Sequence, residues 1–375
     1  MFRTKSEIIM LFMLLFALKG QGQSAWHGGI QAHYGFLIAH RPSMVHLVEN
    51  HVKSIETYIE RSLSSKPWHM RYNSPVHGLS INIGNLANPK MIGMGFGLIH
   101  YVKFKLAGND NFSLGLRLGT GVGYLTKTFD RTTNNKNNAI GSHFNGLMST
   151  QLEFTRVWER FQLGAGLSLL HYSNGAMTMP NLGLNMPSAF LSLNYRIKEP
   201  GAAIVLHNSE YYGNQPRWTF STLFSGGIRE LGQPLGPKYT CFTLETFASR
   251  ILNSKTNALF GIDVLNNGSL SKAWQTAMEE DLNRWKFTQL GLMAGIELGM
   301  DELKISLQQG FYVISKYKGD GNYYQRLALR YFFKNNMIAQ FALKTHFAKA
   351  DYFELGLGYR FAKSKTIYGG SNGFK

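Results

Sequence analysis

Strict alternation of apolar with small or polar residues is the feature that most limits what this chain can fold into. In the stretch NFSLGLRLGTGVGYL one face carries Phe112, Leu114, Leu116, Leu118, Val122 and Tyr124. The positions between them are mostly glycine. A period of two residues is the signature of a β-strand. Strands of globular proteins average about 5–6 residues, whereas a tilted transmembrane strand needs about 9–11, and this apolar row is of the longer kind.

The same alternation predicts long strands throughout the chain. They are expected near 28–39, 49–63, 77–87, 92–107, 111–129, 145–158, 160–173, 187–198, 216–231, 238–252, 257–266, 285–300, 302–316, 322–334, 337–347 and 351–361. Bacterial barrels have even strand numbers, so we expect about 12 to 16 strands, with about 14 favoured. Hydrocarbon tolerates no unpaired sheet edge, which favours an all-β, antiparallel transmembrane barrel of the outer-membrane type. We find no internal repeat or dividing linker, so residues 23–375 are predicted to form a single barrel domain.

Connections between the predicted strands alternate in length. RVWERF and the turn around 106–110 are short, whereas DRTTNNKNNAIGSHFNG and SLSKAWQTAMEEDLNRW are long. Outer-membrane barrels have short periplasmic turns and long external loops, so the pattern favours that location. A short helix is expected in the second long loop, from Ser271 to Leu282.

The first residues have the order of a secretory signal. Arg3 and Lys5 precede an apolar run of eleven residues from Ile8 to Leu18, and small residues follow up to Gly22. This order predicts a signal peptide over residues 1–22, cleaved near Gly22. Eleven residues are too few to span a bilayer as a helix, and no later apolar run is long enough either.

Charge and cysteine content narrow the possible partners. Lys and Arg number 39 against 22 Asp and Glu, and they are scattered along the chain. Nucleic acid is one conceivable partner of so basic a chain, but an exported protein meets anionic lipid or lipopolysaccharide first. Scattered charge is equally compatible with simple solubility. A single cysteine, Cys241, excludes an intrachain disulfide. The predicted cleavage site has no cysteine beside it, which argues against a lipoprotein anchor.

One polar segment stands out at the end of a predicted strand: LLHYSNGAMTMPNLGLN, residues 169–185. His171 and Ser173 continue the parity of the apolar row that ends at Leu169, so both are expected on the outward face at the loop end. Residues i and i+2 lie about 6.5–7 Å apart along a strand, close enough for a histidine to act as base to a serine. A polar pair at a barrel rim is more often a solvated strand end, so spacing alone leaves both readings open.

The letters HYSNG…PNLGLN resemble the His-x-Ser-Asn…Pro-Asn-x-Gly motif of PagL-type outer-membrane lipid A 3-O-deacylases, often labelled acyloxyacyl hydrolases. The resemblance covers about residues 90–198, so the chain looks like an enlarged relative. It implies a serine esterase that removes an ester-linked acyl chain from lipid A or a related glycolipid. No cofactor is implied, and the remaining histidines lack metal-ligand spacing, so no metal is expected.

The resemblance also assigns roles to residues of this chain. Ser173 matches the nucleophile and His171 the general base. Four further positions match the motif's oxyanion and loop residues: Asn174, Gly175, Asn181 and Gly183. Of these, Asn181 matches the residue associated with the oxyanion hole. The PNLG letters are also a good turn in their own right.

The chain departs from the family at Asn185, where compact members carry a glutamate that orients the histidine. Asparagine can hold a histidine tautomer by hydrogen bonding, but it cannot stabilise the imidazolium as a carboxylate does. Three outcomes follow: weaker activation by Asn185, substitution by another acid, or an inactive site. Glu153 has lumen parity and is a poor substitute, whereas His143 and Asp130 lie near the outer end and could be close to His171.

Two other classes of function stay open at this point. One is a non-catalytic outer-membrane barrel, a channel or a structural protein, that retains the motif. The other is a soluble secreted β-sandwich. The lipid partner is lipid A, lipopolysaccharide or a phospholipid, and the sequence favours neither a monomer nor a dimer.

Overall fold

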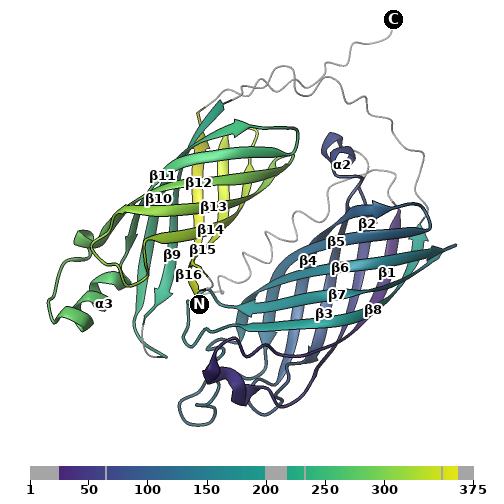
Figure 1. Ribbon diagram of the computed structural model, residues 1–375, viewed down its shortest axis with the longest axis horizontal. Coiled ribbons are helices and arrows are strands. Elements are labelled where there is room, and N and C mark those ends of the chain that lie inside the picture. The colour runs from purple at the N-terminus through teal and green to yellow at the C-terminus, as the bar shows by residue number, and fades with distance from the viewer. Residues whose placement is uncertain (1–24, 64–65, 199–217, 232–233, 348, 362–375) are drawn as a thin grey trace, which may run out of the picture. The chain divides into compact units, whose positions relative to one another are not determined.

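The computed structural model describes residues 25–63, 66–198, 218–231, 234–347 and 349–361, and this part of the chain is built from antiparallel strands (Figure 1). The first eight strands are β1 (Trp26–Gly35), β2 (Val52–Ser62), β3 (Val76–Asn85), β4 (Met94–Gly108), β5 (Phe112–Leu125), β6 (Phe144–Trp158), β7 (Phe161–Ser173) and β8 (Leu184–Lys198). The next eight are β9 (Trp218–Glu230), β10 (Lys238–Ile251), β11 (Thr256–Asn267), β12 (Thr288–Met300), β13 (Leu303–Ile314), β14 (Tyr323–Phe332), β15 (Met337–His346) and β16 (Lys349–Arg360). Every predicted strand has its counterpart. The expected signal peptide, 1–22, lies outside the described residues.

The strands close into two barrels rather than one. β1 pairs with β8 from Trp26 to Gly35, which closes the first barrel, β1–β8. β16 pairs with β9, which closes the second barrel, β9–β16, and each barrel is a compact unit of its own. The prediction of a single barrel domain is therefore wrong, and the favoured count of about 14 strands is too low. Alternation records which face of a strand is apolar, but not which strand closes the sheet.

Side chains fill the interior of the first barrel. Tyr101, Arg117 and Tyr172 are each at most 2% exposed. Arg117 donates hydrogen bonds to Glu56 and, at 2.8 Å, to Ser80 Oγ. Its guanidinium carbon lies 3.4 Å from the centre of the Tyr101 ring. Eight strands enclose a space that side chains just fill.

The glycines of β5 face this crowded interior, as their parity predicts. A Cβ on Gly123 would lie 2.3 Å from Cε1 of Tyr172, so only glycine leaves room for that ring. The opposite face of the strands is apolar and open. Leu167 is 65% exposed and Leu191 69% exposed, on odd-numbered positions of β7 and β8. The second barrel repeats this arrangement with Phe220, Phe224, Leu307, Leu355 and Leu357 exposed.

Long connections gather at one end of each barrel. In the first barrel they are 36–51, 86–93, 126–143 and 174–183, and the 3-10 helix η1 (Pro42–Leu47) lies in the first of them. The other end has the short turns 109–111 and 159–160, together with a longer connection that holds α2 (Pro67–Arg71).

In the second barrel, α3 (Ser269–Met278) and the 3-10 helix η2 (Arg284–Phe287) occupy the β11–β12 connection. The predicted helix is therefore present, and it ends at Glu279 in a left-handed conformation. Every helix of the described ranges falls short of the length and apolar content that crossing a membrane as a helix requires.

Candidate active site

Strand β7 carries His171 and Ser173 at its loop end, in the parity of the exposed residues Leu167 and Leu169. Tyr172, between them, is fully buried in the barrel interior. The two candidate residues thus share the outward face, as the alternation predicts. Ser173 is nevertheless only 8% exposed. Asn181 of the connection 174–183 lies against its hydroxyl, with Nδ2 3.0 Å from Oγ.

Asn185 lies directly across from His171 in the β7–β8 pairing. The distance between His171 Nδ1 and Asn185 Oδ1 is 2.7 Å. An amide oxygen only accepts hydrogen bonds, so Nδ1 of the imidazole carries the proton and Nε2 presents its lone pair. That is the tautomer a general base needs.

The other end of the Asn185 amide contacts a third residue, His40. Asn185 Nδ2 lies 3.2 Å from His40 Nδ1 and donates to it. His40 belongs to the connection 36–51, which is tied to β8 because the backbone N–H of Ile38 donates to the Asn185 carbonyl at 2.9 Å. The sequence alone does not single out His40, since a histidine in a long loop becomes informative only when the fold of the loop is known.

Asn181 faces the hydroxyl of Ser173. The backbone N–H of Asn174 donates to Asn181 Oδ1 at 3.0 Å, which turns the amide so that Nδ2 lies 3.0 Å from Ser173 Oγ. The side chain of Asn174 points away, with Nδ2 donating at 2.8 Å to both Ser142 Oγ and the Thr178 carbonyl. Asn181 therefore offers N–H donors beside the hydroxyl, whereas Asn174 braces the loop.

Gly183 and Gly175 both adopt conformations that favour glycine, with φ of +79° and +61°. The N–H of Gly183 donates to the Ala139 carbonyl at 3.0 Å. A Cβ on Gly183 would lie 3.0 Å from Cε1 of His171 and 3.1 Å from the Tyr172 carbonyl oxygen. The absence of a side chain at Gly183 lets the connection pass directly against the imidazole.

The three alternative acid or base residues, Glu153, His143 and Asp130, form hydrogen bonds with other partners. Glu153 lies in the barrel interior, where Ser192 Oγ donates to it at 2.6 Å and Lys103 Nζ lies 3.4 Å away. His143 Nδ1 donates to the Leu125 carbonyl at 2.7 Å.

Asp130 closes its own turn in the connection 126–143. The backbone N–H of Thr133 and the hydroxyl of Thr132 donate to its carboxylate, at 2.7 Å in each case, and hold its pKa below the usual value. Asn185 is thus the residue that pairs with the His171 ring.

The second barrel does not repeat this arrangement. β15, like β7, is the seventh strand of its barrel and has a histidine near its loop end, His346. That histidine lies in the interior, with Nε2 3.0 Å from Tyr312 Oη and Nδ1 3.5 Å from Asp351. Asp351 is also bonded to Lys344 Nζ at 2.5 Å. Over the described ranges, no group of three or more His, Cys, Asp or Glu side chains is arranged to hold a metal ion.

Comparison with solved structures gives low overall similarity. A mutant of the Rh. blastica porin matches at 7% identity and a TM-score of 0.17, over 90% of this chain and 100% of the porin. CdiB from Acinetobacter baumannii matches at 9% identity and a TM-score of 0.18, over 90% of this chain and 60% of CdiB. None of the curated proteins compared matches the chain.

Two family models match, one on each barrel. Residues 53–194 match lipid A 3-O-deacylase (PagL), and residues 218–364 match the C-terminal domain of acyloxyacyl hydrolase. The first match contains every candidate site residue named from the motif, and the two matches together cover most of the chain. The chain therefore belongs to the PagL family of lipid A 3-O-deacylases, which are ester hydrolases.

Proposed function

We propose that this protein is an outer-membrane serine esterase that removes an ester-linked acyl chain from lipid A. The observation that carries the proposal is the continuous set of contacts from His40 through Asn185 to His171, beside the Ser173–Asn181 contact. His171, Ser173 and Asn185 share the outward face of β7 and β8, where an acyl chain lying against the barrel brings its ester.

The chemistry follows from the tautomer of His171. Nε2 accepts the proton of Ser173 while Oγ attacks the ester carbonyl carbon, and a tetrahedral intermediate forms. Its negative oxygen forms beside Asn181, whose Nδ2 donates to Ser173 Oγ at 3.0 Å in the resting site. Because these donors are already in place when the charge develops, the step needs little reorganisation of the site.

Collapse of the intermediate breaks the bond between the carbonyl carbon and the sugar oxygen. That oxygen takes the proton from His171, and the acyl chain stays on Ser173 as an ester. Water then attacks the acyl ester with His171 again as base, so a free fatty acid leaves and Ser173 regains its proton. Each step requires His171 to carry a second proton transiently, and Asn185 orients the ring during this change without adding a negative charge.

The membrane placement rests on three supports: the expected signal peptide, the apolar outward faces of the strands, and the grouping of long connections at one end. Lys90, Lys127 and Lys136 lie exposed in those connections of the first barrel. Lipid A phosphates are anionic, so such lysines suit its headgroup. The family match and this charge pattern support lipid A as the substrate.

A non-catalytic barrel is the second candidate, and the neutral Asn185 is the observation that favours it. The channel form of this reading conflicts with the filled interiors of the two barrels. Tyr101, Arg117 and Tyr172 occupy the first, and Tyr324, Arg326 and Arg330 the second, each at most 2% exposed. A structural protein that keeps the motif is therefore the alternative that remains to be tested.

The test is the lipid A profile of an outer membrane that contains the protein, measured by mass spectrometry. We expect loss of one acyl chain with the wild type and none with Ser173→Ala. Ser168→Ala is the matched control, because Ser168 lies on the same strand but faces the interior, 2.7 Å from Ser188 Oγ. Identical lipid A and phospholipid profiles for wild type and Ser173→Ala would overturn the enzyme proposal.

A further inference from the structure

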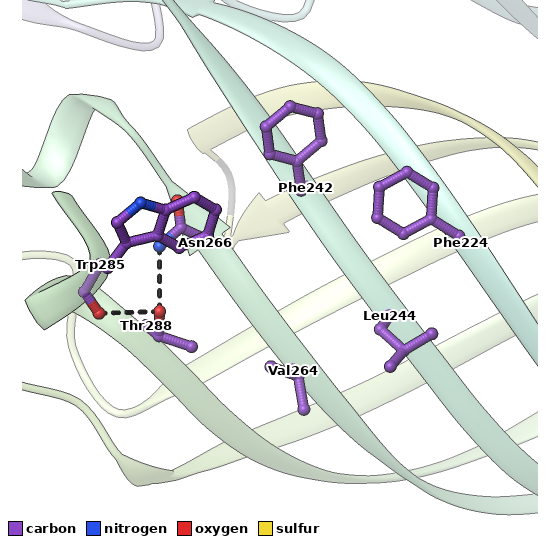
Figure 2. A pocket seen from close by; sticks show the side chains of 7 residues that line it. All are labelled: Phe224, Phe242, Leu244, Val264, Asn266, Trp285 and Thr288. Atoms are coloured by element: carbon purple, nitrogen blue, oxygen red, sulfur yellow. Dashed lines mark hydrogen bonds between the residues drawn. The ribbon is translucent and has the colours of Figure 1, made fainter.

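An apolar groove lies on the outer face of the second barrel, next to the connection that carries Trp285 (Figure 2). Its volume is about 390 Å³, and it is lined by Phe224, Phe242, Leu244, Val264, Asn266, Trp285 and Thr288. Ligand pockets span about 300–1,000 Å³, so this groove is of ligand size. The four apolar strand residues form its floor, and Trp285, which is 64% exposed, forms one wall.

The groove lies in the half of the barrel next to the loops. Phe242 pairs with Asn266, and Leu244 pairs with Val264 on one side and Phe224 on the other. Asn266 is next to the end of β11, and its Nδ2 donates to Thr288 Oγ1 at 3.0 Å (Figure 2). The apolar floor thus ends in a polar rim. This change from apolar to polar residues matches the change from acyl chain to headgroup along a lipid molecule.

Arg284 is fixed at this rim. Its guanidinium carbon lies 5.5 Å from the ring centres of both Phe242 and Trp285. Nε donates to Asn266 Oδ1 at 2.8 Å, and the two terminal nitrogens donate to Thr240 Oγ1 at 2.9 Å and to the Thr240 carbonyl at 3.0 Å.

A guanidinium has five N–H donors, and these contacts use three of them within the described part of the chain. Two donors are left over by these contacts, and the guanidinium brings a full positive charge to the side of Phe242 and Trp285. Three basic and three acidic residues share the connection 268–287, so the preference for an anion rests on the position of Arg284 and not on net charge.

We propose that this groove is a second lipid A site, non-catalytic, in which an acyl chain covers Phe224, Leu244 and Val264 while a phosphate of the headgroup pairs with Arg284. The proposal rests on the outer-membrane placement proposed above, because the loop end then meets the leaflet that contains lipid A. A fixed arginine flanked by aromatic rings suits a phosphate next to hydrocarbon. The site would hold lipid A at the protein while the first barrel performs the chemistry.

Binding is tested in the full-length protein with Ser173→Ala, so that lipid A is retained rather than consumed. The protein is purified in detergent, supplied with defined diphosphorylated lipid A, and the bound copies are counted by native mass spectrometry. Leu244→Trp with Val264→Trp fills the groove with side chains that still face lipid. In this filled-groove variant we expect the number of bound lipid A molecules to fall by one. The affinity of the groove for lipid A should fall at least about tenfold, since losing the burial of even two methylene groups costs this much free energy.

Leu307→Trp is the matched control, because Leu307 is an outward residue of β13 and is 54% exposed. It should retain the wild-type number of lipid A copies. Equal retention by the filled-groove and control variants would overturn the site. Retention of phosphatidylglycerol in the groove at the level of lipid A would overturn the assignment to lipid A.

The headgroup contact has its own test. In the Ser173→Ala background, the groove should prefer diphosphorylated over dephosphorylated lipid A by about tenfold, and Arg284→Gln should remove this preference. A preference that survives Arg284→Gln would overturn the pairing. These binding results do not depend on catalysis: a filled groove that loses lipid A while Ser173-dependent deacylation continues separates this proposal from the proposed function.

Discussion

Asn185 Oδ1 lies 2.7 Å from Nδ1 of His171, at directly paired positions of β7 and β8. This contact fixes the tautomer of the imidazole but places a neutral amide where compact family members have a carboxylate. Orientation of the His171 ring and stabilisation of its positive charge are thus separated in this site. The first is supplied by the Asn185 amide, and the second is absent from that position.

Substitutions at Asn185 measure the two contributions. Asn185→Ala should lower kcat/KM by about 10- to 100-fold, because a hydrogen bond to a group that becomes charged contributes about 1.5–3 kcal/mol. Asn185→Glu should raise kcat/KM above the wild type, because a carboxylate also stabilises the imidazolium. The rate of fatty acid release from lipid A in detergent is the measurement. A glutamate variant no faster than the alanine variant would contradict this account.

His40 is a positioning residue in this scheme. It accepts a hydrogen bond from Asn185 Nδ2 and so keeps Oδ1 directed at His171. His40→Ala should lower kcat by several-fold in the wild type. The same substitution should have little effect in an Asn185→Glu background, because a carboxylate has no amide end to orient.

His46→Ala is the control for this loop, since His46 lies in the same connection and its Nε2 bonds to the Lys136 carbonyl at 2.7 Å. It should leave kcat unchanged in both backgrounds. Equal losses from His40→Ala in both backgrounds would mean that His40 only stabilises the loop.

The strands and the parity of the site were predictable from the sequence because both depend on local alternation. Phe161 to Leu169 fixes the outward face of β7, and His171 and Ser173 follow from it. Asn185 was also identified, because the motif spacing carries it. His40 was not, because its contact with Asn185 depends on how sixteen residues of connection fold, and no periodic pattern runs through them.

The closure into two barrels was missed for a different physical reason. Each strand has an apolar face and a small or polar face whether eight or sixteen strands close the sheet. The available signal was the stretch that begins Glu199-Pro200-Gly201 and ends near Pro216, since proline and glycine mark the ends of regular structure. Its placement is outside the described residues, but it separates β8 from β9 in the sequence.

Gly183 should be required for the position of the His171 ring. Gly183→Ala places a methyl group 3.0 Å from Cε1 of the imidazole, at a φ of +79°. We expect loss of most deacylation with a folded barrel. Gly321→Ala is the control, because Gly321 has a φ of +85° and a Cβ there would have no neighbour within 4 Å. The two variants share the cost of a side chain at positive φ, so an equal loss of activity in both would contradict the local role.

Asn181 Nδ2 donates to Ser173 Oγ at 3.0 Å, which makes Asn181 the proposed oxyanion donor. Asn181→Ala should lower kcat by about 10²–10³, the usual cost of removing one oxyanion donor, with a smaller effect on KM. Asn88→Ala is the control: Asn88 is fully buried and its Oδ1 accepts from the backbone N–H of Met91 at 2.9 Å, so it should reduce stability without changing kcat of the folded protein. Parallel losses of kcat in both variants would assign Asn181 to loop structure alone.

Substitution of Arg117 measures how much the charged pair in the interior stabilises the first barrel. Arg117→Met leaves the carboxylate of Glu56, which is 1% exposed, without its arginine, and should lower the free energy of unfolding by about 3–5 kcal/mol. The double variant Arg117→Met, Glu56→Leu removes both charges and should recover most of that loss. Urea unfolding in lipid vesicles, followed by tryptophan fluorescence, measures both. Because Ser173 lies on the opposite face of the sheet, the folded fraction of each variant should deacylate at the wild-type rate, and a slower rate would mean that the interior and the site are coupled.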